Sequence, residues 1–269
     1  MAKLQAKPRP TPAQPDLQGA ATVDLAAVEL DFEGFRALAL NENLSANEKI
    51  GFPDSYREGF EAAILADIQR KLPGLGQPGC RVLDIGPGCA GLPRKIMSLC
   101  AGAGGLIALV DSPEMLAQLP EGEHVIKTPG LFPRNLADVR GRMPQADVII
   151  CYSVLHYIFL DTNLFGFVDA VVELLAPGGR ALIGDIPNQS KRRRFFASEA
   201  GRAFHAHFTG STTAPEVSWN APTPGKIDDA VLIGLMQRAQ AAGCDAYLMP
   251  QAADLPMQNR RDDLLIVKP

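Results

Sequence analysis

Short apolar runs alternate with helix-compatible segments across residues 81–183, and this alternation constrains the fold more than any other feature of the sequence. The runs have the length and apolar character of buried strands. They are residues 81–85, 105–110, 124–127, 147–151 and 180–183. Helix-compatible segments lie between them at 92–100, 113–119 and 164–175. Because a strand–helix–strand order produces a parallel sheet covered by helices, we expect an α/β fold with a doubly wound, mostly parallel sheet.

The flanking segments divide the chain into three parts. Residues 1–20 predict a flexible tail, because their Pro, Gln and Ala offer little to bury. Residues 21–79 predict a helical N-terminal extension, and residues 80–269 a core domain with an insertion at 189–227. The elements expected in the extension are helices at 23–40 and 56–72 around a loop at 41–53. Those expected after the core strands are a helix at 191–208, a loop at 209–224, a helix at 228–242 capped by Asp228, and strands at 246–250 and 263–267.

Composition argues against several classes of function. Lys and Arg number 26 against 30 Asp and Glu, so the net charge of −4 disfavours binding to a nucleic-acid backbone. The five cysteines contain no C-x-x-C pair, which predicts no zinc site and reduced thiols. The longest nearly apolar stretch, residues 148–160, falls short of the ~20 residues that a membrane-spanning helix needs. We therefore expect a cytoplasmic protein without a membrane, metal or nucleic-acid partner.

A glycine-rich turn joins the first expected strand to the following helix. Gly86 and Gly88 let the backbone turn sharply and approach a ligand. The pattern G-x-G-x-x-G also occurs in dinucleotide-binding folds, and by itself it does not choose between ligands. The carboxylate of Asp84, just before the turn, would repel a pyrophosphate and attract an ammonium group. Asp111, at the end of the next strand, could accept both hydroxyls of a ribose. A ligand with an ammonium group, a ribose and no phosphate is S-adenosylmethionine.

Four segments together resemble class I S-adenosylmethionine-dependent methyltransferases. They are LDIGPGCAGLP (83–93), ALVDSPEML (108–116), ADVIICYSVLHYI (146–158) and LLAPGGRALIGDIPN (174–188). The resemblance implies a Rossmann-like sheet of seven strands, all but one parallel, which the two late strands would complete.

The resemblance also implies roles for individual residues. It places Asp84 and Gly86 at the methionine amino group, Pro87 and Gly88 along the cofactor, Asp111 at the ribose, Ser112 and Met115 near the adenine, and Tyr152 and Ser153 beside the methionine moiety. One departure is that residues 127–131 lack the acidic residue with which the family often binds the adenine amine. We therefore expect backbone groups and apolar contacts to hold the adenine.

Residues that could bind or deprotonate the methyl acceptor occur after the fourth and fifth strands and in the N-terminal extension. His156 and Asp185 are the candidate general bases. The alternatives are a core or pocket histidine at 156 and a helix-capping aspartate at 185. Asn188, Lys191, Arg192 and Tyr56 are candidate substrate contacts. The four basic residues at 191–194 predict either a site that binds an anionic substrate group or a solvent-exposed helix face.

We therefore expect S-adenosylmethionine-dependent methylation of a small molecule, preferably at oxygen, with a sugar or sugar nucleotide as one candidate acceptor. One alternative is an NAD-dependent oxidoreductase, against which Asp84 argues. Another is a non-catalytic binding protein that keeps the methyltransferase fold. The sequence leaves the oligomeric state open, with a homodimer among the options.

Overall fold

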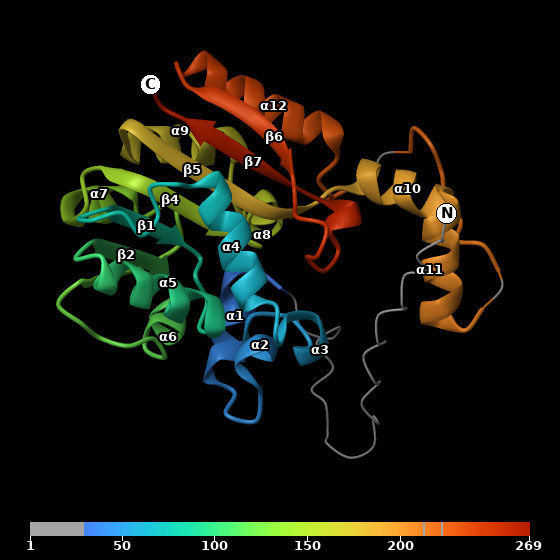
Figure 1. The fold of residues 1–269 in the computed structure, drawn as a ribbon, viewed down its shortest axis with the longest axis horizontal. Helices are drawn as coiled ribbons and strands as arrows, with labels where there is room; N and C mark the ends of the chain where they lie inside the picture. Colours follow the sequence, from blue (N-terminus) through green and yellow to red (C-terminus); the bar gives the residue numbers. More distant parts are fainter. Residues whose placement is uncertain (1–29, 212, 222) are drawn as a thin grey trace, which may run out of the picture.

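A seven-stranded sheet forms the centre of the molecule (Figure 1). The computed structural model describes residues 30–211, 213–221 and 223–269. The strand order is β3-β2-β1-β4-β5-β7-β6, and only β7 runs against its neighbours. The strands are β1 (Arg81–Ile85), β2 (Leu106–Asp111), β3 (Val125–Pro129), β4 (Ala146–Tyr152), β5 (Leu175–Pro187), β6 (Asp245–Pro250) and β7 (Arg261–Val267). The predicted doubly wound, mostly parallel sheet is confirmed. The order reverses between β1 and β4, which is where such sheets bind ligands.

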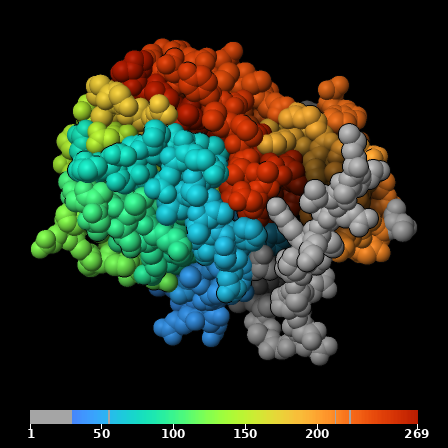
Figure 2. All heavy atoms as spheres, viewed as in Figure 1, coloured from blue at the N-terminus to red at the C-terminus, as the bar shows by residue number. Residues whose placement is uncertain are grey.

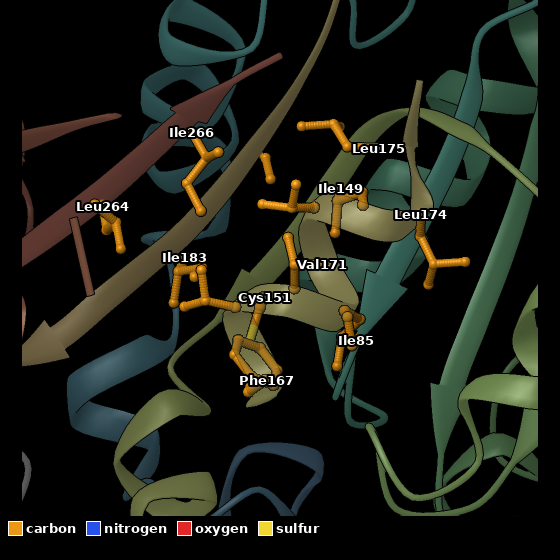
Figure 3. Close-up of a cluster of buried hydrophobic side chains, with 14 of the residues drawn as sticks. Ile85, Ile149, Cys151, Phe167, Val171, Leu174, Leu175, Ile183, Leu264 and Ile266 are labelled. Carbon is orange, nitrogen blue, oxygen red and sulfur yellow. The ribbon is translucent and has the colours of Figure 1, made fainter. Parts of the chain in front are cut away.

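Helices cover both faces of the sheet because alternate strand residues are apolar on each face. Leu83 and Ile149 belong to one buried cluster, and Val82 and Val148 to the other. Figure 3 shows the first cluster, where Phe167 packs beneath the strands. The helices beside the core strands are α5 (Gly91–Gly102), α6 (Pro113–Leu116), α7 (Leu136–Arg142), α8 (Leu155–Asp161), α9 (Leu164–Leu174) and α12 (Asp229–Ala241). The short helix α8 was not expected, because its apolar residues continue the pattern of β4. Among the described helices, none is long and apolar enough to cross a bilayer.

The N-terminal extension consists of shorter helices than the sequence predicted. Helix α1 (Phe32–Leu40) begins at the N-cap Asp31; the predicted tail at 1–20 and residues 23–29 of the predicted helix lie outside the described residues. The predicted loop at 41–53 contains α2 (Ala46–Lys49). The predicted helix at 56–72 is wrong as a single element, because Gly59 has φ +83° between α3 (Asp54–Arg57) and α4 (Glu61–Lys71).

The insertion after β5 also contains two helices where one was predicted. Helix α10 (Gln189–Ala197) ends at Ser198, whose hydroxyl caps α11 (Glu199–Thr209) by accepting from the Gly201 amide. The described residues between α11 and α12 include no helix or strand. Asp228 caps α12 as predicted, accepting from the Val231 amide.

Candidate functional site

A large cavity lies at the carboxyl ends of β1, β2 and β4. The strand ends and the turns that follow them form one wall, including Gly86, Asp111 and Tyr152. The N-terminal extension forms the opposite wall, including Phe35 and Ile50. The cavity is mostly apolar, with few polar groups, as small-molecule sites usually are.

The glycine-rich turn brings backbone to the surface of this cavity. Gly86 and Gly88 have φ values of +70° and +66°, which disfavour side chains. A Cβ on Gly86 would lie 2.7 Å from Val154 Cγ2, and one on Gly88 would lie 2.5 Å from Ile50 Cγ2. Both glycines line the cavity together with Pro87.

Asp111 lines the cavity at the tip of β2 and holds the glycine-rich turn in place. Its Oδ2 accepts from the Gly88 amide at 2.9 Å, and its Oδ1 accepts from the Ser112 amide at 2.7 Å. Burial raises the pKa of this carboxyl to about 6, although the two amides act in the opposite direction. Two well-positioned carboxylate oxygens can accept the paired hydroxyls of a ribose.

Asp84 lies beneath the cavity wall and does not line it. The residue is 3% exposed, and no described residue hydrogen-bonds to its carboxylate. Burial, and then the nearby charge of Asp111, raise its pKa to about 8. An acid buried without a partner favours a cationic neighbour. The predicted contact between Asp84 and an amino group therefore has electrostatic support.

The other predicted cofactor contacts divide into cavity-lining and structural residues. Met115, Tyr152 and Ser153 line the cavity. Ser112 does not; its hydroxyl caps α6 by accepting from the Met115 amide. Beyond β3, the segment Gly130–Phe132 lines the cavity with backbone and apolar groups, and the acidic residue Asp161 at the end of α8 lines it too.

A buried polar cluster follows the tips of β4 and β5. Ser153 and Asp185 both have positive φ, 64° and 57°, an uncommon conformation for residues other than glycine. Asp185 Oδ2 accepts hydrogen bonds from Arg57 at 3.1 Å, from Arg261 at 2.9 Å and from the Ser153 hydroxyl. The backbone amide of Asp185 donates to Asp263. These bonds occupy the carboxylate that was predicted to act as a base, and Asp185 caps no helix.

Arg57 is the main residue that the sequence did not reveal. It lies at the end of α3, lines the large cavity and also lines a second, much smaller cavity, which would have to widen to admit more than a water molecule. Its guanidinium carbon is 4.2 Å from the centre of the Phe52 ring, which lines both cavities. No motif surrounds Arg57 in the sequence, and its role depends on how the extension folds over the sheet.

His156 lies behind the cavity wall and is absent from its lining. Its ring centre is 3.9 Å from that of Tyr157, which lines the cavity. Burial, and then the charge of Arg261, lower the pKa of His156 to about 3, so the imidazole is neutral at physiological pH. Its Nδ1 is buried and has no hydrogen-bond partner among the described residues. The predicted direct position at the acceptor is therefore not what the structure shows.

The predicted substrate contacts are also divided. Asn188 is a correction: it is buried, caps α10 and donates to Asp229 and Asp262. Lys191 is a second correction, because its ammonium group pairs with Asp262 at 2.6 Å. Tyr56 lines the second cavity.

Arg192 is exposed on α10 and lies over an aromatic ring, away from the large cavity. Among the described residues, no group of three or more His, Cys, Asp or Glu side chains is placed to hold a metal ion.

Comparison with solved structures shows the fold family. A chain from the complex between the Haloferax volcanii Trm112 methyltransferase activator and a methyltransferase superimposes with a TM-score of 0.54, 14% identity, and coverage of 87% of this chain and 97% of that chain. The N-methyltransferase NodS from Bradyrhizobium japonicum WM9, in complex with S-adenosylhomocysteine, gives a TM-score of 0.51, 14% identity, and coverage of 88% and 98%. No protein-family model and no curated protein matches the sequence. The chain therefore has the Rossmann-like fold of class I methyltransferases, as the sequence motifs indicated.

Proposed function

We propose that this protein is a methyltransferase that uses S-adenosylmethionine to methylate a small molecule. One observation carries the proposal. A single cavity is lined by the glycine-rich turn and by the Asp111 carboxylate, which could accept hydrogen bonds from ribose hydroxyls, and the unpartnered carboxylate of Asp84 is buried nearby. The shared fold with NodS, which was solved with S-adenosylhomocysteine bound, supports the same assignment.

The residues present fit this cofactor. Gly86 and Gly88 present backbone to the cavity, and Asp111 offers two acceptors for the ribose. Asp84 favours the amino group, and Arg57 offers a cation for the carboxylate at the same end of the ligand. Met115 and residues 130–132 give apolar walls for the adenine. When bound, S-adenosylmethionine supplies an electrophilic methyl group on a sulfonium.

The second cavity is the proposed acceptor site. It shares Phe52, Arg57 and Tyr152 with the large cavity, so a molecule there lies beside the cofactor pocket. The chain's part in the reaction is to orient the acceptor and exclude water. Asp185 Oδ2 accepts from both arginines and Oδ1 accepts from the Gln251 amide, and we assign Asp185 to positioning Arg57 and Arg261.

We retain oxygen as the proposed acceptor atom and neutral His156 as the proposed base. Since His156 lies behind Tyr157, this role requires the two side chains to shift when the acceptor binds. The proposed base predicts that His156→Ala lowers kcat much more than cofactor affinity. Equal losses in both would assign His156 to the cofactor pocket.

Two alternatives predict different ligands. An NAD-dependent oxidoreductase would need to place a pyrophosphate near the buried acid Asp84, which is unfavourable whenever that acid is charged. A non-catalytic protein with this fold would bind the same cofactor or neither ligand, without turnover.

Calorimetric titration tests the proposal, with S-adenosylhomocysteine and NAD as parallel ligands. We expect micromolar binding of S-adenosylhomocysteine alone. Asp111→Asn should weaken it roughly 10- to 100-fold, the value of a hydrogen bond to a charged group, about 1.5–3 kcal/mol. Asp138→Asn, at an exposed carboxylate on α7, is the control and should bind as the native chain does. Binding of NAD alone, or of neither ligand, would refute the proposal.

A further inference from the structure

Three arginines meet where the second cavity adjoins the α10–α11 insertion. Arg261 lines the second cavity, and Arg260 ends the short 3₁₀ helix η2 (Gln258–Arg260) just before it. Arg192 lies on α10, which packs against η2. In the space-filling view, the red segment before β7 fills the surface between α4 in cyan and α10 in gold (Figure 2).

Arg192 and Arg260 share one aromatic neighbour. The guanidinium carbon of Arg192 lies 4.9 Å from the centre of the Phe196 ring, and that of Arg260 lies 6.0 Å from the same centre. Arg260 also lies 5.2 Å from the Phe204 ring. Aromatic rings hold guanidiniums in place without consuming their hydrogen-bond donors. The N–H groups of both guanidiniums therefore remain available to a ligand.

Among the described residues, these two arginines differ from Lys191, Arg193 and Arg194 in having neither an acidic partner nor a side-chain hydrogen bond. Lys191 pairs with Asp262, and Arg194 pairs with Asp229. Within residues 30–211, 213–221 and 223–269, neither Arg192 nor Arg260 forms an ion pair or a side-chain hydrogen bond. Burial and the neighbouring charges of Arg261 and Arg192 lower the pKa of Arg260. Like charges gathered at a half-buried position are unfavourable unless an anion joins them.

Arg192 and Arg260 do not line the second cavity themselves, but Arg260 lies next to residues that do. Tyr56, Met257 and Arg261 line the second cavity, and Arg260 lies between the last two in sequence. A molecule whose anionic group is held by Arg260 has to extend past Arg261 to reach the wall formed by Phe52 and Arg57, which the two cavities share.

We propose that Arg192 and Arg260 form an anion subsite of the acceptor site, and that the methyl acceptor carries an oxyanion, either a phosphate or a carboxylate. The identity of the ligand as the acceptor rests on the proposed methyl transfer. The planar forks of the arginines suit such groups because they can donate two parallel hydrogen bonds. Of the basic run at 191–194, only Arg192 contributes to this subsite, and Lys191 has a structural role.

Titration of the full-length protein at low ionic strength tests the subsite, with inorganic phosphate in one arm and acetate in the other. We expect one of the two anions to bind, and Arg260→Ala or Arg192→Ala to weaken that binding at least tenfold. Arg260→Lys should keep part of the affinity. The matched control is Arg202→Ala on α11, an exposed arginine that donates to the Ala197 carbonyl; it removes the same charge and should change nothing.

S-adenosylhomocysteine is titrated into the same samples, which separates this inference from the proposed function. Its affinity should stay within twofold of the native value in every variant, and its binding should not displace the anion. The inference is refuted if neither anion binds, if Arg202→Ala loses as much as Arg260→Ala, or if the anion competes with S-adenosylhomocysteine. Failure of S-adenosylhomocysteine to bind would refute the proposed function. The anion titration would still show whether Arg192 and Arg260 bind an anion.

Discussion

At the scale of single residues, Asp84 is the group whose charge state matters most. Its pKa of about 8 exceeds that of an unfolded aspartate, 3.8, because burial disfavours the charged form. The folded chain therefore binds this proton more tightly than the unfolded chain does. By linkage, Asp84 lowers the free energy of unfolding as the pH rises from about 4 to about 8.

The Asp84→Asn variant checks this sign. It removes the ionisation, so its stability should fall less than that of the native chain between pH 5 and pH 8. Urea unfolding at several pH values measures the difference, with Asp138→Asn as the control for losing an exposed carboxylate. A native-like pH dependence in Asp84→Asn would mean that Asp84 is already ionised at neutral pH.

The same residue makes a prediction about ligand binding. Below pH 8 most Asp84 carries a proton, and an ammonium group beside it favours its loss. Binding of S-adenosylhomocysteine at pH 7 should therefore release up to one proton. Calorimetry in HEPES and in Tris, whose ionisation enthalpies differ, measures the release. Asp84→Asn should abolish it, and an unchanged release would place the titrating group elsewhere.

At the scale of elements, the glycine-rich turn depends on Gly88. Alanine there would have to adopt φ +66°, which costs about 1–2 kcal/mol, and its Cβ would press on Ile50 in the N-terminal extension. We expect Gly88→Ala to lower stability by that amount or more and to weaken S-adenosylhomocysteine binding. Gly102→Ala is the control, because a Cβ there meets nothing within 4 Å. Equal affinities in the two variants would contradict the close-approach role of Gly88.

Helix α4 is attached to the sheet by a buried ion cluster. Lys71 pairs with Asp67 at 2.6 Å and with Asp263 at 2.7 Å, and all three side chains are almost wholly buried. Lys71→Met would leave the buried Asp263 carboxylate without its cation and Asp67 with only the exposed Arg70, and should cost about 3–5 kcal/mol of unfolding free energy. Arg70→Ala removes an exposed partner of the same Asp67 and should cost at most about 1 kcal/mol. Similar losses in chemical denaturation would show that the buried cluster contributes no more than a surface pair.

The site residues that could be predicted are those whose position is set by a short stretch of sequence. Asp84, Gly86 and Asp111 occupy strand ends within a short motif, so their sequence spacing indicated their place. Asn188 and Lys191 follow a strand in the same way, but their partner Asp262 lies on β7, which sequence spacing does not reveal.

The helix breaks at Gly59 and Ser198 were missed because apolar spacing continues across both. Arg57 and Arg260 were missed because each comes to the site only through contacts between distant segments.

At the scale of the whole molecule, the N-terminal extension forms one wall of the cavity. Phe35 on α1 packs edge-on against Tyr157 after β4, with ring centres 4.7 Å apart, and both rings line the cavity. The extension and the sheet thus meet over the proposed cofactor site. We expect this contact to open when a ligand leaves, so that it influences the rate of release.

Phe35→Ala tests this arrangement. Removing the ring should increase the rate of S-adenosylhomocysteine release roughly two- to tenfold, because an aromatic pair contributes about 0.5–1.5 kcal/mol beyond its buried area. Stopped-flow displacement measures that rate. Leu40→Ala removes an exposed side chain, 68% accessible, from the same helix and should release the ligand at the native rate. If Phe35→Ala also released it at the native rate, the ligand would leave by a path that does not pass between α1 and the sheet.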